Sequence, residues 1–236
     1  MGYSVIGKSL PQVNSPEKVS GEALYVHNIK RSRMLHAKVL RSSHPHALIR
    51  NIDFSKARKL RGVKAAVSFD DTPGLPWGPI YKEHYIFAPR KVHYFGEEVA
   101  AVAAVDEETA EEALSLIEVE YEVLPSVFDP EEALLDGAPL IHDAYPGNLA
   151  RHIQIERGDI EKGFKEAAEV HEDVYETPHQ FQAYMEPIGT VAEVDSAGRL
   201  TVHAATQSIY FARELLAEAL GPVSYTHLTL PTNREV

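Results

Sequence analysis

The chain contains no cysteine among its 236 residues, which excludes disulfides, iron–sulfur clusters and cysteine-ligated zinc within it. Long hydrophobic runs are missing too: the longest, Val99 to Val105, is far shorter than the ~20 residues that span a bilayer. The N-terminus lacks the basic and apolar regions of a signal peptide. Positive charge is scarce, with a formal net charge of −12, and a phosphate backbone would be repelled. We therefore expect neither a membrane nor a nucleic acid as a partner.

The apolar fraction of 44% is sufficient for a hydrophobic core, and the length suits one large or two small domains. The run Val99 to Val105 is typical of a strand covered on both faces. Asp106 then has the position of a helix N-cap, and apolar residues follow at helical spacing. From Ile117 to Val123 apolar and polar residues alternate, as in a half-buried strand. This strand–helix–strand order predicts a mixed α and β domain.

Shorter elements precede this unit. Alternation predicts a strand from Leu35 to Leu40, and two more β-type runs flank a short helix expected over Phe54 to Leu60. These two runs are Ala47 to Ile52 and Val63 to Phe69. Residues 72–90 are rich in proline and glycine, which indicates a loop. Its large aromatic residues are expected to pack the loop onto the core, with a ligand contact as the alternative: Trp77, Tyr81, Tyr85 and Phe87.

A second block follows a connector rich in proline, glycine and aspartate. Its pattern predicts a helix that is capped by Asp159 and runs to Ala168, with one strand before it and one after it. A β-hairpin and an amphipathic helix that ends at Gly221 are predicted to follow. The predicted strands are His152–Glu156 and Val170–Glu176, the hairpin strands Glu186–Asp195 and Arg199–Ala205, and the last helix Gln207–Leu220.

Two groups of ionisable residues are candidates for chemistry. His44 and His46 could place two imidazoles on one strand face as in a metal site, but zinc would need further ligands that the sequence does not supply. His171 and His179 lie near carboxylates at 172, 173 and 176, without the spacing of a zinc protease, so solvated charges are the simpler interpretation. Glycine-rich phosphate loops and serine-hydrolase motifs are not present in the sequence.

Gln207 is the strongest candidate from its position. Thr206 or Ser208 can cap the following helix, which leaves the glutamine amide at the helix's positive end. Such a place suits an oxyanion or oxo ligand. Polar residues at helix caps are usually structural, so a structural role is the simpler interpretation and ligand binding is the alternative.

Several blocks of sequence together resemble the large, molybdenum-binding subunit of the xanthine dehydrogenase and aldehyde oxidase family, the molybdenum hydroxylases. The similarity covers nearly all of residues 4–222. The blocks are Gly7-Lys8-Ser9, residues 16–21, Leu35 to Ala47, residues 92–102 with 119–125, Met185-Glu186-Pro187, and Ala205-Thr206-Gln207.

The resemblance implies an α+β fold, with an a/b hammerhead domain followed by the truncated start of a molybdopterin-binding α+β domain. The implied segments are an extended lead-in over 1–17, the hammerhead domain over 18–126, a connector over 127–147, the first molybdopterin-binding domain over 148–222, and a non-native tail over 223–236.

In the family, a glutamine at the position of Gln207 approaches the oxo ligand of the molybdenum, so Gln207 is the expected cofactor-binding residue, although Ala205 stands where serine is common. The Glu186-Pro187 pair is expected to be structural only. The family's glycine-rich loop and catalytic glutamate are missing, so we expect no catalytic residue here and an inactive N-terminal fragment.

The implied reaction is a hydroxylation with oxygen from water, or a reductive dehydroxylation, of a heterocycle, an aldehyde or an aromatic acyl-CoA. Molybdenum–molybdopterin is the implied cofactor, and 2Fe-2S and FAD are expected on partner subunits in the cytoplasm. Trp77-Gly78-Pro79 and its spacing to residues 88–92 resemble the 4-hydroxybenzoyl-CoA reductase branch.

Two other functions stay open on the sequence alone. The same fold could serve as a non-catalytic binding or assembly module, because fold does not determine function. A metal hydrolase that uses His44 and His46 is the third possibility.

Overall fold

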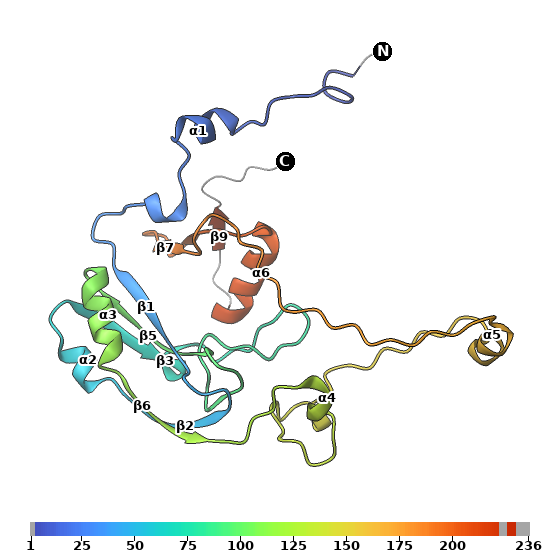
Figure 1. Ribbon diagram of the computed structural model, residues 1–236. Coiled ribbons are helices and arrows are strands. Elements are labelled where there is room, and N and C mark those ends of the chain that lie inside the picture. Colours follow the sequence, from blue (N-terminus) through green and yellow to red (C-terminus); the bar gives the residue numbers. More distant parts are fainter. Residues whose placement is uncertain (1–2, 222–225, 230–236) are drawn as a thin grey trace. The chain divides into compact units, whose positions relative to one another are not determined.

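A computed structural model describes residues 3–221 and 226–229 of the chain (Figure 1). The chain forms two compact units, one of residues 1–125 with 186–236 and a smaller one of residues 126–185. The expected tail over 223–236 lies mostly outside the described residues.

The first sheet of the larger unit has the order β1-β5-β3, and both pairings are antiparallel. Its strands are β1 (His36–Arg41), β5 (Glu98–Ala104) and β3 (Val63–Ser68). The central strand β5 is the small-apolar run of the sequence. Its face with Ala100, Val102 and Ala104 is buried, whereas Ala101 and Ala103 on the other face are half-buried, so the predicted cover on both faces is only partial.

Two helices pack on this sheet, α2 (Ser55–Lys59) and α3 (Glu107–Ser115), and Figure 1 shows α3 beside β1 and β5. Asp106 caps α3 as predicted, because its side chain accepts from the Thr109 amide at 2.8 Å. Ala110 and Ala113 are fully buried against the sheet. Small side chains at these positions let α3 approach the strands closely.

The second sheet has the order β4-β2-β6, also antiparallel. Its strands are β4 (Lys91–Val92), β2 (Ala47–Asp53) and β6 (Glu118–Val123). The predicted strand–helix–strand unit therefore connects two different sheets, because β5 belongs to the first and β6 to the second. A smaller buried cluster lies on this sheet, made of Ala47, Ala88, Val92 and Val99.

The third sheet begins with an antiparallel hairpin, β7 (Thr190–Val194) and β8 (Leu200–Ala204). The strand β9 (Thr226–Thr229) pairs with β8 in parallel. The turn is held by Asp195, whose carboxylate accepts from the amides of Ala197 and Arg199 at 2.9 Å each. Helix α6 (Ile209–Leu220) follows, and Gly221 ends it with a φ of 80°. The predicted hairpin and helix are confirmed, each shorter than expected.

Short helices account for most of the remaining regular structure in the larger unit. The N-terminal segment contains α1 (Ser15–Ser20) and the 3-10 turn η1 (Val26–Asn28), and η2 (Phe69–Asp71) follows β3.

The smaller unit contains helices but no strand, and all its residues are described. Its elements are α4 (Pro130–Ala133), η3 (Pro146–Asn148) and α5 (Ile160–Glu166). Asp159 caps α5 as predicted. The strands predicted over 152–156 and 170–176 are wrong: both segments are exposed and have no ladder. Alternating side chains make a strand only where a second strand pairs with its backbone.

Candidate functional site

Gln207 lies in the connection between the last residue of β8, Ala204, and the first of α6, Ile209. Its side chain is exposed, and its amide makes no hydrogen bond to any described part of the chain. Both the amide donor and the carbonyl acceptor are therefore available to a ligand. The structure thus places the predicted residue at a strand–helix junction, as the sequence pattern indicated.

The start of α6 adds further donors beside Gln207. Ser208 occupies the N-cap position but makes no side-chain capping hydrogen bond. Thr206 instead accepts from the Ser208 amide at 3.2 Å, which orders the turn without capping the helix. First-turn amides without a cap carry partial positive charge and suit an anionic or oxygen-rich group. The donors present here fit an acceptor-rich cofactor.

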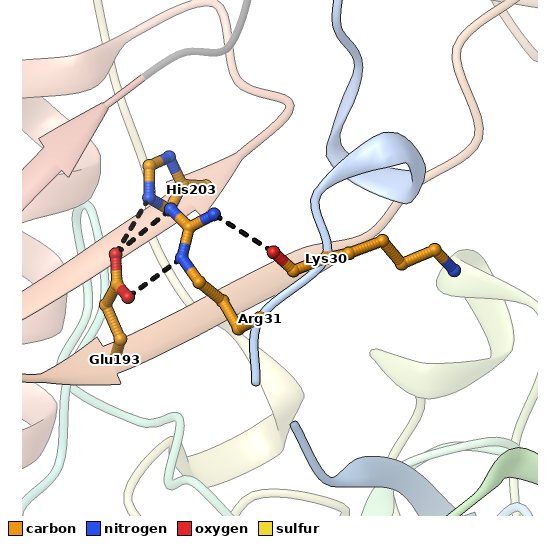
Figure 2. Close-up of polar contacts among 4 residues, drawn as sticks. All are labelled: Lys30, Arg31, Glu193 and His203. Atoms are coloured by element: carbon orange, nitrogen blue, oxygen red, sulfur yellow. Dashed lines mark hydrogen bonds and ion pairs between the residues drawn. The ribbon is translucent and has the colours of Figure 1, made fainter. Parts of the chain in front are cut away.

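A charged cluster braces the hairpin that leads to this junction (Figure 2). Arg31 donates through Nε and Nη2 to the two carboxylate oxygens of Glu193 on β7, at 3.0 and 3.2 Å. The His203 ring on β8 lies 3.4 Å from Glu193 Oε1. The Arg31 guanidinium, and after it the His203 ring, hold the pKa of Glu193 below its ordinary value. Glu193 on β7 therefore contacts both the N-terminal segment, through Arg31, and β8, through His203.

His44 and His46, the candidate metal pair, have different surroundings. The His44 ring packs edge-on against Tyr121, with the ring centroids 5.0 Å apart. His46 is buried, and its Nδ1 lies 2.5 Å from the carbonyl oxygen of Pro125, while its Nε2 is buried without a hydrogen-bond partner among the described residues. Over residues 3–221, no group of three His, Asp or Glu side chains could hold a metal ion.

The acidic and histidine residues near position 172 are exposed on the smaller unit. His171 contacts Glu169 at 3.4 Å, and both side chains are 81% exposed. Charges so well solvated contribute little to stability. Solvation of these charges agrees with the simpler interpretation of the sequence.

The aromatic loop packs on itself and on its neighbours. Trp77 pairs with His84 through two backbone hydrogen bonds and a ring contact at 5.3 Å. Tyr85 meets Phe69 edge-on at 5.6 Å, and Phe87 is buried. The loop and the apolar face of α6 together line a cavity of about 770 Å³. Within the part of the chain that the structure describes, Trp77 Nε1 is buried without a hydrogen-bond partner. Gln207 does not line this cavity.

Sequence reasoning missed the brace formed by Arg31, Glu193 and His203. Arg31 and Glu193 are 162 positions apart, so no local pattern joins them. The pairing depends on the hairpin register, which places His203 opposite Val191 and one diagonal step from Glu193. Glu186, expected to be structural, has a buried Oε1 without a hydrogen-bond partner in the described part of the chain.

Two protein-family models match this chain and identify its domains. The family model for the aldehyde oxidase and xanthine dehydrogenase a/b hammerhead domain matches residues 20–125. The model for the molybdopterin cofactor-binding domain matches residues 141–227, which include Gln207. The fold is therefore a hammerhead domain followed by the start of a molybdopterin-binding domain.

Curated relatives point to the same family. The chain is 41% identical over 201 residues to a probable xanthine dehydrogenase subunit of Bacillus subtilis, covering 85% of this chain and 27% of that protein. It is 36% identical over 220 residues to the nicotinate dehydrogenase large molybdopterin subunit of Eubacterium barkeri, covering 93% and 51%. The chain thus spans between about a quarter and a half of these relatives.

Solved structures agree on the fold. Quinoline 2-oxidoreductase from Pseudomonas putida 86 superposes with a TM-score of 0.84 at 28% identity, over 95% of this chain and 30% of that one. The aldehyde oxidoreductase from Desulfovibrio desulfuricans has a TM-score of 0.84 at 24% identity, over 98% and 27%, which shows the fold alone. The chain belongs to the xanthine dehydrogenase and aldehyde oxidase family of molybdenum hydroxylases, as part of the molybdenum-binding subunit.

Helices within the described ranges are all too short or too polar to cross a membrane.

Proposed function

We propose that this chain is part of a large subunit that catalyses hydroxylation with oxygen from water, or the reverse dehydroxylation, on a heterocycle, an aldehyde or an aromatic acyl-CoA. One observation carries the proposal: the exposed Gln207 amide, which has no hydrogen-bond partner among the described residues, at the junction of β8 and α6, inside the segment matched by the molybdopterin-binding family model. The relatives and solved structures carry names that include xanthine, nicotinate, quinoline and aldehyde. The substrate of this protein is therefore proposed at the level of class only.

Gln207 is proposed to hold the cofactor by donating from its side-chain amide, together with the uncapped amides at the start of α6. Molybdenum–molybdopterin supplies the redox chemistry when it is bound. The chain's own contribution is orientation, because a fixed donor at the right position requires no reorganisation during the reaction. No catalytic acid or base is assigned among the residues of this chain.

Electrons are proposed to leave through 2Fe-2S and FAD groups on partner subunits in the cytoplasm. The lack of cysteine supports this division, because iron–sulfur clusters in proteins are held by cysteine thiolates. Relatives named as subunits of dehydrogenases support a multi-subunit enzyme. The resemblance of the Trp77-Gly78-Pro79 loop to the 4-hydroxybenzoyl-CoA reductase branch makes an aromatic acyl-CoA one substrate to test.

The test is Gln207→Ala in the full-length, molybdenum-loaded subunit. We expect turnover to fall by about 100-fold while the metal content stays unchanged, because one preorganised donor is lost. The measurement is steady-state turnover on a panel of purines, aldehydes and aromatic acyl-CoA thioesters, with molybdenum determined by mass spectrometry.

Gln12→Ala is the matched control, because Gln12 is an exposed glutamine in the N-terminal segment. Unchanged turnover in Gln207→Ala would remove the role proposed for this residue. A full-length subunit that contains neither molybdenum nor pterin would instead favour the non-catalytic binding module.

A further inference from the structure

The N-terminal segment approaches the β7–β8 hairpin at two places, and at one of them, Arg31, it makes a direct contact. At the base of the hairpin, a Cβ added at Gly189 would lie 3.4 Å from Val26 Cγ1, and Val26 is 3% exposed. Five residues after Val26, Arg31 donates two parallel hydrogen bonds to Glu193 on β7 (Figure 2). The two parallel hydrogen bonds give the Arg31–Glu193 pair a defined geometry as well as a short distance.

The N-terminal segment is itself ordered between these two places. Val26–Asn28 forms the turn η1, and Asn28 accepts from the Tyr25 amide at 3.1 Å. Arg31 also donates to the carbonyl oxygen of Lys30 at 3.3 Å, which orients its guanidinium. The arginine therefore reaches Glu193 from a segment with a defined backbone.

Glu193 on β7 also contacts β8, so it links the N-terminal segment to both strands of the hairpin. Its Oε1 receives Arg31 Nη2 and lies 3.4 Å from Nε2 of His203, whose side chain is only 16% exposed. His203 is the penultimate residue of β8, and Gln207 follows in the connection to α6. A shift of β8 would therefore move the segment that carries Gln207.

We propose that Arg31 is a positioning residue for the Gln207 segment and acts through Glu193 and His203. Its contacts in the structure are with Glu193 and the carbonyl oxygen of Lys30, and its effect on Gln207 rests on the function proposed above. A single exposed ion pair contributes little to global stability. The Arg31–Glu193 pair matters through its position on the hairpin. We therefore expect its removal to affect the hairpin locally and not the stability of the whole chain.

Hydrogen exchange of the 236-residue chain measures this local effect directly. Arg31→Ala is expected to speed amide exchange in peptides covering residues 190–207 by roughly two- to fivefold, the range that an exposed ion pair allows. Peptides covering β1 and β5 should exchange as in the unaltered chain. Lys38→Ala is the matched control, because Lys38 is also a surface cation but pairs with Glu107 and Glu111 on α3.

A double-mutant cycle then tests whether the effect runs through Glu193. If the brace acts as a unit, Arg31→Ala combined with Glu193→Gln should change exchange no more than the stronger single variant. Additive effects, unchanged exchange over 190–207, or equal acceleration throughout the chain would each overturn the proposal.

The same variant separates this proposal from the proposed function. In the full-length loaded subunit, Arg31→Ala should alter the molybdenum(V) electron paramagnetic resonance signal while the metal content is retained. Suppose that Arg31→Ala speeds hairpin exchange but that neither Arg31→Ala nor Gln207→Ala changes the molybdenum(V) signal. The brace would then be supported, and the proposed cofactor role of Gln207 would be refuted. An unchanged signal in Arg31→Ala alone would overturn the positioning role.

Discussion

At the scale of single residues, Gly78 shows how closely the loop that carries Trp77 is folded. A Cβ at position 78 would lie 1.8 Å from the carbonyl oxygen of Tyr81, so any other side chain forces the backbone apart. Gly78→Ala is expected to destabilise the fold by about 1–3 kcal/mol, as overpacking does, and to expose Trp77 to water.

The chain has one tryptophan, so its fluorescence reports on this loop alone. We expect a red-shifted emission in Gly78→Ala and a lower urea midpoint. Gly163→Ala is the control, because Gly163 lies in α5 and a Cβ added there would meet no neighbouring group within 4 Å. An emission spectrum identical to that of the unaltered chain would show that the loop absorbs the extra methyl group.

At the scale of elements, the β7–β8 turn depends on the ionised Asp195. Backbone donation from Arg199, and next its guanidinium, hold the pKa of Asp195 below its ordinary value of 3.8. Because the folded pKa is the lower one, this stabilisation is fully present above pH 3.8 and is lost as the pH falls through the folded value. Acid should therefore loosen the turn.

Arg199→Ala is expected to raise the pKa of Asp195 only part of the way, since the amides of Arg199 and Ala197 still donate. Carboxyl-carbon NMR titration measures the midpoint. Arg213→Ala changes the net charge equally but removes an arginine that stacks on Tyr210, so its Asp195 midpoint should not move. Equal shifts in both variants would mean that net charge, not the turn contact, sets the value.

Local sequence patterns predicted the elements whose stabilising contacts lie mostly within the element itself. The Asp106 cap and alanine spacing of α3 need only neighbours within the helix and one sheet face. The predicted strands at 152–156 and 170–176 failed because an alternating pattern needs a partner strand, and no strand pairs there. The brace at Arg31 could not be predicted, because its partner is set by hairpin register and tertiary placement.

At the scale of the whole molecule, we expect the 236-residue chain alone to show no substrate-dependent turnover, whereas we expect turnover from the full-length subunit combined with the iron–sulfur and FAD partners proposed for it. The chain spans 27% of one curated relative and 51% of another, and it holds no assigned catalytic base. The measurement is dye reduction by each preparation with the same substrate panel. Turnover by the chain alone would contradict this expectation.

The origin of residues 223–236 also concerns the molecule as a whole. We propose that this segment is not native and that the uninterrupted gene continues after Pro222 into a glycine-rich loop. Residues 226–229 pair with β8 in parallel, which any extended segment with free backbone groups can do. Sequencing the gene decides the question, and the same fourteen codons in frame would refute it.

Neighbouring residues and ordered blocks of sequence were enough to predict the capped helix, the hairpin that leads to Gln207 and the family resemblance. Which distant groups meet is known only from the folded chain. Folding paired Arg31 with Glu193, separated the environments of His44 and His46, and left the Gln207 amide without a partner in the described part of the chain. Hydrogen bonds and ion pairs act over a few ångströms, so contacts between distant positions exist only once the chain has folded.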